Sequence, residues 1–245
     1  MKKIFSLTKR NMKEMLRDPL SLVFCLIFPL VMLILMQIIF ANFENTPINF
    51  NIQSYASGIC VFGYTFIGMF VSLQIAGDKN TSFIKRLNIA PINKFTYYSS
   101  FVCSALPLAV AQTTLFMFVA LIFKFPFNIN FLLTILYLIP SALLYICLGI
   151  MIGIIGKNEK QTGPISSIFI SLVGILGGVF MPLSGLSKGF LTFVNILPFA
   201  HSVSIASDLQ TIGAKAIYPH VLYLLLYTFI FVAISYIIEK IREKR

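Results

Sequence analysis

The stretch "RDPLSLVFCLIFPL", from Arg17 to Leu30, places a charged pair and a proline directly before a run of apolar residues. Proline suits the first turn of a helix, where its missing N–H would have no partner, and a preceding aspartate can accept hydrogen bonds from the free donors of that turn. We therefore expect one helix to end and a second to begin at Asp18 and Pro19. Pro29 lies inside the second helix and is expected to kink it.

The composition indicates that this second helix crosses a membrane. Of the 245 residues, 58% are hydrophobic and 11% are charged, and the mean hydropathy is +0.90. Several uncharged stretches reach or exceed the roughly 20 residues that a helix needs to cross the hydrocarbon core. The predicted fold class is an all-α integral membrane protein, with 1–245 as a single domain. The six expected spans are 20–41, 54–76, 95–123, 131–155, 164–183 and 218–238.

A seventh apolar stretch is not expected to cross. The sequence "GFLTFVNILPFAHSVSIAS", 189–207, carries Asn195, Pro198 and His201, and would leave polar groups without partners in lipid. We therefore interpret 184–217 as an outer segment that dips back without spanning.

Basic residues predict the orientation, because Lys and Arg in short loops accumulate on the cytoplasmic side. With six spans and both termini in the cytoplasm, every Lys and Arg except Lys124, Lys188 and Lys215 faces inward. The net charge of +11 then lies beside anionic lipid, and argues against a nucleic-acid partner. The chain is therefore expected to be a multi-pass membrane protein.

The leader 1–18 has the pattern of a helix lying in the interface. At 100° per residue, its apolar residues gather on one side and its six basic residues on the other. The alternative is a disordered basic leader.

The segment "GDKNTSFIKRLNIAPINK", 77–94, is the longest cytoplasmic loop, and 78–91 is expected to hold a short helix. Asn80 or Thr81 can cap it, and Pro91 can end it. A helix this short needs a surface to lie against. The membrane surface and a groove on a soluble partner are both open. The apolar side would carry Phe83, Ile84 and Leu87, and the basic side Lys85 and Arg86.

Small and amide side chains mark where helices approach each other or where a path runs. Residues four apart with small side chains allow close backbone contact in lipid, and packing within one subunit is favoured over a dimer face. The small residues are Gly149 and Gly153 in one span and Ser167, Ser171, Gly174 and Gly178 in the next. The amides at membrane depth are Gln37, Gln74 and Gln112, which are either packing partners or path-lining groups.

Motifs for catalysis or metal binding are absent from the sequence. No G-x-x-x-x-G-K-[ST] loop, H-E-x-x-H or G-x-S-x-G motif occurs, so no catalytic residue or metal ligand is predicted, and the chain is not expected to hydrolyse ATP. The cysteines show no paired metal-ligand spacing. The six expected spans contain no ionisable Asp, Glu, Lys, Arg or His at membrane depth, which argues against an ion-coupled carrier. The cysteines are Cys25, Cys60, Cys103 and Cys147.

Taken in order, the leader ending in "RDP", the span "LSLVFCLIFPLVMLIL", the loop "KRLNIAPINKFTYYSS" and the segment "FMPLSGLSKGFLTFVNILPFAHSV" resemble the membrane subunit of ABC-2 type exporters over nearly the whole chain. The resemblance implies a half-transporter of six helices that pairs with a copy or a relative. It also implies an elbow helix at 1–18 and a pair of short outer helices at 182–198. One departure is the sequence Asp78-Lys79-Asn80-Thr81, where many members have an acidic residue followed by a Gly-Thr pair.

The same resemblance implies a function. An ATP-binding subunit, using ATP and Mg²⁺, would drive export of an amphipathic cargo such as a drug, an antibiotic peptide or a lipid-like molecule. The alternative is a membrane protein that needs no ATPase: a carrier, an assembly factor, or an immunity or sensor protein that binds a peptide at its outer face. The implied contacts with the ATPase are Asn80, Thr81, Phe83, Ile84, Lys85, Arg86 and Leu87 of a coupling helix.

Overall fold

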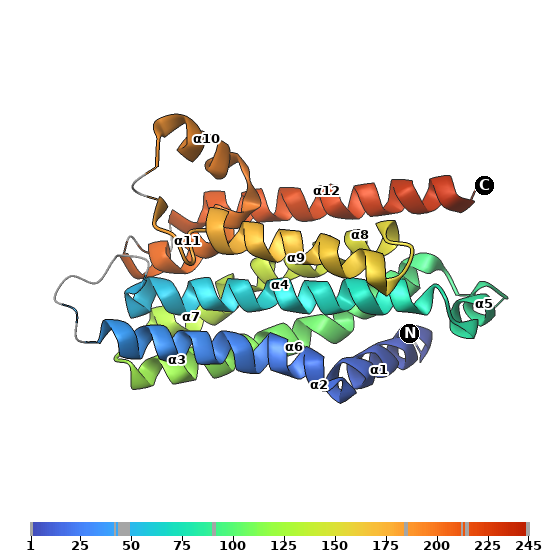
Figure 1. Cartoon of the computed structure of the whole chain (residues 1–245), viewed down its shortest axis with the longest axis horizontal. Helices are drawn as coiled ribbons and strands as arrows, with labels where there is room; N and C mark the ends of the chain where they lie inside the picture. The colour runs from blue at the N-terminus through green and yellow to red at the C-terminus, as the bar shows by residue number, and fades with distance from the viewer. Residues whose placement is uncertain are drawn as a thin grey trace.

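The computed structural model describes residues 2–41, 43, 50–89, 92–183, 186–211, 213 and 216–243. Throughout these ranges the regular structure is helical. The helices form an elongated bundle, with α5 (Ser82–Ile89) and both ends of the described chain toward one end and the outer pair α10 and α11 toward the opposite end (Figure 1). The protein is an all-α integral membrane protein.

The first two helices meet at Asp18. Helix α1 (Lys2–Arg17) ends there, and α2 (Pro19–Leu22) begins with proline in its first turn. The Asp18 carboxylate accepts from Leu20 N at 3.2 Å and from Ser21 N at 3.3 Å. These bonds supply two of the donors that a helix start leaves unpaired.

Pro29 changes the first span without breaking it. The segment η1 (Val23–Ile27) is a π-helical turn between α2 and α3 (Phe28–Phe40). Pro29 cannot donate to the carbonyl four residues before it, which belongs to Cys25 in this turn. Pro19–Phe40 nevertheless counts as one helix long enough to cross.

Five helices in the described part are long and apolar enough to cross a membrane. Besides Pro19–Phe40, they are α4 (Ile52–Asp78), α6 (Lys94–Ile122), the pair α7 (Ile129–Tyr137) and α8 (Ile139–Ile155) taken as one, and α12 (Ile217–Glu243).

The expected span 164–183 differs from the structure. Helix α9 runs over Glu159–Leu176, so it begins five residues earlier and ends seven residues earlier. Gly178 follows it with φ of +78°, a backbone conformation that favours glycine and ends the helix. Gly178 therefore lies in a turn, and the prediction that it continues a helical stripe is wrong.

The outer pair is sharply bent. Helices α10 (Lys188–Ile196) and α11 (Pro198–Thr211) meet at 83°, and together they are apolar enough to count as a sixth crossing if taken as one broken span. The same geometry also describes a re-entrant loop.

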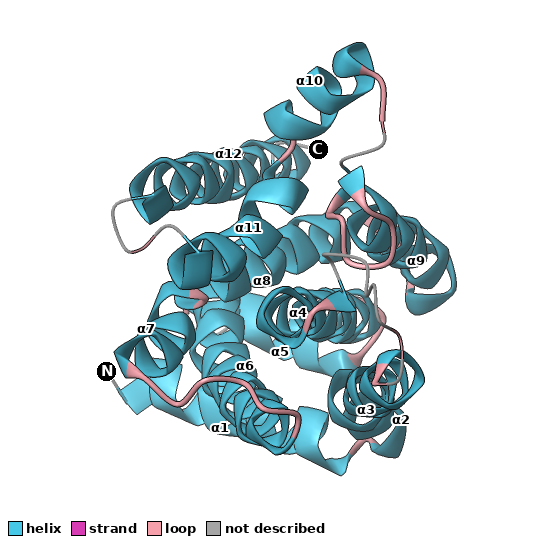
Figure 2. Cartoon of the chain, turned by 90° about the vertical axis from the view of Figure 1, so that its left-hand side faces the viewer, coloured by secondary structure: helices cyan, strands magenta, loops and turns pink. Residues whose placement is uncertain are grey.

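Helix α4 lies inside the bundle and contacts α3, α6, α8, α9 and α11 (Figure 2). Its closest neighbour is α8, because glycines remove the side chains between them. A Cβ on Gly149 would lie 2.2 Å from the carbonyl oxygen of Gly68, and a Cβ on Gly153 would lie 2.9 Å from that of Ser72. Both glycines therefore pack within one subunit.

The serines of α9 are placed differently. Ser167 and Ser171 are exposed, and each donates to a carbonyl of its own helix at 3.0 Å. Gly174 is buried beside Phe180 and Phe62. The predicted stripe is thus divided between the core and the outer surface.

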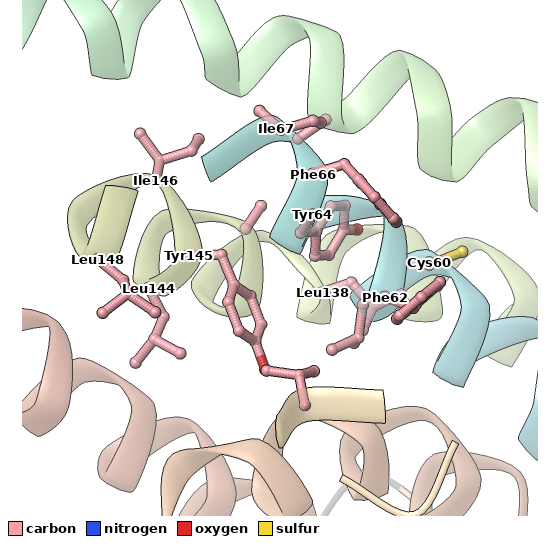
Figure 3. Close-up of a cluster of buried hydrophobic side chains, with 14 of the residues drawn as sticks. Cys60, Phe62, Tyr64, Phe66, Ile67, Leu138, Leu144, Tyr145, Ile146 and Leu148 are labelled. Atoms are coloured by element: carbon pink, nitrogen blue, oxygen red, sulfur yellow. The ribbon is translucent and has the colours of Figure 1, made fainter. Parts of the chain in front are cut away.

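Large aromatic side chains fill the core around α4 and α8. Tyr64 and Tyr145 are both 1% exposed, and Figure 3 shows them among Phe62, Phe66 and their apolar neighbours. The hydroxyl of Tyr64 pairs with Thr113 and that of Tyr145 with a serine of α11 at 2.9 Å. These bonds satisfy buried hydroxyl groups that would otherwise be costly.

Candidate functional site

A buried carboxylate joins three helices at the α5 end of the bundle. Asp78, the last residue of α4, is 5% exposed. Arg10 of α1 donates to it twice, at 2.9 Å and 2.5 Å, and the hydroxyl of Tyr97 in α6 donates at 2.7 Å. A buried charge requires this degree of pairing.

Arg10 extends the junction to α5. Its guanidinium lies 3.8 Å from the centroid of the Phe83 ring, close enough for a cation–π interaction. Its Nε also donates to Glu14 at 2.9 Å. Burial lowers the pKa of Arg10, but the bonds to Asp78 outweigh that effect and raise it above the ordinary value. Arg10 therefore stays charged and holds α1, α4 and α5 together.

Lys79 connects the same junction to α8. Its ammonium group donates to the carbonyls of Gly153 and Ile154 at 2.6 Å and of Gly156 at 2.7 Å. Burial and the nearby Arg242 lower the pKa of Lys79 to about 8, so it remains charged at neutral pH. A cation suits the carbonyl-rich end of a helix.

A second cation reaches the same helix end from α12. Arg242 donates to the carbonyl of Ile154 and, at 3.0 Å, to that of Ile155. The C-terminal ends of α4, α8 and α12 are thereby fastened at one place.

The expected coupling helix is present as α5, but its apolar side faces the bundle. Leu87 is 7% exposed, and Phe83 and Ile84 are half-buried against the core. The chain itself covers Leu87, whereas Phe83 and Ile84 stay partly exposed, and contact of this side with a partner remains a prediction. The side chain of Lys85 and residue Pro91 lie outside the part of the structure that is described.

The two candidate capping residues each bond to a backbone carbonyl. Thr81 donates its hydroxyl to the carbonyl of Asp78 at 2.7 Å, and Asn80 donates to the carbonyl of Lys157 at 3.4 Å. Both are exposed and both join α5 to its surroundings.

The exposed side of α5 and a neighbouring loop form a surface that we call the docking face. On α5, Arg86 is exposed and Ile89 is 86% exposed. Residues 157–161, which comprise the end of the α8–α9 connection and the first turn of α9, are exposed beside Asn80. This segment is not among the residues predicted to contact a partner, although Asn158 caps α9 and accepts from Gln161 N at 3.0 Å. The docking face consists of Asn80, Thr81, Ser82, Arg86, Ile89 and 157–161.

The three glutamines each bond to the protein. Gln112 is fully buried and donates to the carbonyl of Cys60 at 3.2 Å. Gln37 donates to the carbonyl of Phe50 at 3.0 Å, and Gln74 donates to Glu14 of α1. In the single chain they act as packing partners.

The far end contains a histidine pair. Nδ1 of His201 in α11 lies 2.7 Å from Nδ1 of His220 in α12. The outer nitrogens contact the carbonyl of Asn195 at 2.8 Å and the carboxylate of Asp208 at 2.9 Å. Within the described residues, no group of three His, Cys, Asp or Glu is arranged to hold a metal ion.

Comparison with known proteins decides the family. The sequence profile described as "ABC-2 type transporter" matches residues 2–211. The chain belongs to the ABC-2 type transporter family. This ABC-2 protein is also 23% identical to the Bacillus subtilis (strain 168) protein named "Putative transport permease YvfS" over 243 residues, which cover 95% of each chain.

A second relative comes from Dictyostelium discoideum. It is named "ABC transporter G family member 20", and it is 23% identical over 164 residues, covering 66% of this chain and 22% of the relative. The ABC-2 match includes α1, the junction and the outer pair, so the protein is a membrane permease subunit of an ABC transporter.

Proposed function

We propose that the chain is the permease of an ATP-driven exporter in the bacterial plasma membrane, with the α5 end in the cytoplasm. ATP and Mg²⁺ would be used by a separate ATP-binding subunit bound at the docking face. The observation that carries this proposal is the junction: one buried ion pair, Arg10 with Asp78, ties the base of α5 to α4 and α1.

The junction suits the transmission of force. Closure of two ATP-binding subunits would push on α5 and on 157–161, and the bonds of Asp78 and Lys79 would carry that displacement into α4 and α8. Because α4 and α8 pack backbone to backbone, they would move as one body between two packings of the bundle.

A second membrane subunit, a copy or a relative, would complete the path. The exposed serines Ser167 and Ser171 on α9 support a helix partner on that face, since small hydroxyl side chains permit close approach in lipid. Aromatic residues continue on the adjoining helices: Phe24 of the first span stacks on Phe66 with centroids 5.7 Å apart. A path along this face would be mostly apolar, which favours an amphipathic cargo.

The test is co-expression with an ATP-binding cassette subunit from the same organism. The wild-type pair should co-purify and transport in vesicles only with ATP and Mg²⁺, whereas the chain alone should be inactive. R86E/I89D changes the docking face and should abolish co-purification at normal membrane insertion. K188E, at the opposite end, is the matched control and should assemble normally. Transport by the lone chain, or assembly of R86E/I89D at wild-type yield, would reject the proposal.

A further inference from the structure

A cavity of about 530 Å³ lies between α6 and α12. Both helices pack on α8, which forms the floor through Cys147, Ile150 and Ile154. Toward the outer end, α7 contacts α6, α11 contacts α12, and α7 and α11 contact each other, so the groove closes. We call this cavity the α6–α12 pocket. Its walls are Asn93, Lys94, Phe95, Tyr98, Ser99 and Val102 on one side and Val232, Ser235, Tyr236, Glu239 and Lys240 on the other.

The pocket is polar at one end and apolar at the other. Lys94 begins α6, and Val102 lies eight residues further along the same helix, a rise of about 12 Å. On α12 the order is reversed: Val232 comes eight residues before Lys240, which lies near the end of the helix. A molecule that fills the pocket must therefore have a polar head and an apolar body about as long as this rise along α6.

The charged groups favour an anionic head. Lys94 pairs with Glu239 at 2.7 Å, and the hydroxyl of Tyr98 donates to the same carboxylate at 3.1 Å. With Glu239 balanced in this way, Lys240 gives the mouth a formal charge of plus one. Its ammonium group lies over the ring of Tyr236, 5.9 Å from the centroid. A cationic head would meet this charge unfavourably.

The mouth opens toward lipid. In the most apolar part of α12, only 11% of the residues are buried by the rest of the chain. At the rim of the pocket, Tyr236 is 65% exposed and Phe95 is 69% exposed. Aromatic side chains at this depth are typical of the membrane interface. A molecule that enters sideways from the bilayer is therefore the natural occupant.

We propose that the α6–α12 pocket binds one anionic phospholipid, with its phosphate beside Lys240 and Lys94 and an acyl chain against Val102, Ile150 and Val232. Basic pockets between helices at a membrane surface bind anionic lipid headgroups, and the volume lies in the usual range for ligand sites. Binding of the lipid does not depend on export. Only the placement of the pocket mouth in the cytoplasmic leaflet rests on the proposed function.

The test uses the full chain, purified in detergent and reconstituted in nanodiscs that contain equal amounts of phosphatidylglycerol and phosphatidylcholine. After re-extraction, retained lipid is counted by native mass spectrometry. Wild type should retain one phosphatidylglycerol. K240Q should retain roughly fivefold less, the effect of one cation near a headgroup. V232W fills the apolar part without changing charge and should lose the lipid too. K13Q removes an equal charge from the exposed side of α1, outside the pocket, and should match wild type.

Three results would overturn the proposal. The first is equal retention of the two lipids by wild type, and the second is wild-type retention by K240Q or by V232W. The third is displacement of the lipid by millimolar glycerol phosphate, which would identify a site for a soluble anion. Co-purification with the ATP-binding subunit is scored separately, so a chain that binds the lipid but no ATPase would reject only the exporter.

Discussion

Arg10 and Asp78, 68 residues apart in the sequence, form a two-pronged ion pair at 2.9 Å and 2.5 Å, in which the carboxylate is almost fully buried. Three helices depend on this one contact: α1 carries the arginine, α4 carries the aspartate, and α5 lies beneath the guanidinium through Phe83.

R10Q should destabilise the protein by about 3–5 kcal/mol, because it leaves a buried carboxylate without its charge partner. E14Q, which affects an exposed pair with the same arginine, should cost about 0–1 kcal/mol. Denaturant unfolding in mixed micelles measures both. R10Q/D78N should recover much of the loss, and a double variant no better than R10Q would contradict the assigned pairing.

L87A should destabilise the fold by about 2–4 kcal/mol, since Leu87 packs into the core and truncation leaves a cavity. I89A, two residues later on the exposed side, should leave the melting temperature within the experimental error. Thermal unfolding in detergent separates the two. If L87A melted like wild type while I89A unfolded early, α5 would be rotated from the orientation described above.

G149A should lower stability by about 1–3 kcal/mol through overpacking, because its Cβ would meet the backbone of Gly68. G189A is the control: it lies in helix α10 with nothing within 4 Å of a new Cβ, and alanine suits a helix better than glycine. Melting temperatures of the two variants should therefore move in opposite directions. A stable G149A would show that α4 and α8 can separate readily.

The histidine pair joins α11 to α12. Nδ1 of His201 lies 2.7 Å from Nδ1 of His220, and the outer nitrogens contact the carbonyl of Asn195 and the carboxylate of Asp208. H201A should lower the melting temperature in detergent, because it removes the contact with His220 and leaves its partners unsatisfied. An unchanged melting temperature would show that this pair does not hold the two helices together.

The sequence predicts some of these features for identifiable reasons. Capping chemistry is local, so the start of a helix at Asp18 and Pro19 can be read from adjacent residues. Helical periodicity separates Phe83 and Leu87 from Arg86, but it cannot say whether the apolar side meets lipid, a partner or the same chain. The structure gives the third answer, because α5 folds back onto Arg10 and Tyr97.

Other features depend on contacts between distant segments. Helical periodicity predicts neither the contact of Arg10 with Asp78 nor that of Lys79 with the end of α8. The early end of α9 comes from the left-handed backbone of Gly178, whereas composition alone extends the apolar stretch to residue 183. The α6–α12 pocket is lined by residues of three helices, so the sequence of any one of these helices does not predict it.

Lys79 and Arg242 both donate to the carbonyl of Ile154 at the end of α8. A fluorescent protein or affinity handle inserted within a few residues of Arg242 would thus lie beside the anchor of α4 and α8. A bulky fusion there would strain the contacts that hold α8 in the centre of the permease. A chain shortened before Arg242 would lose the bonds of this arginine to the end of α8. Labels for tracking this protein are better inserted in the loop between α6 and α7, which touches neither cation.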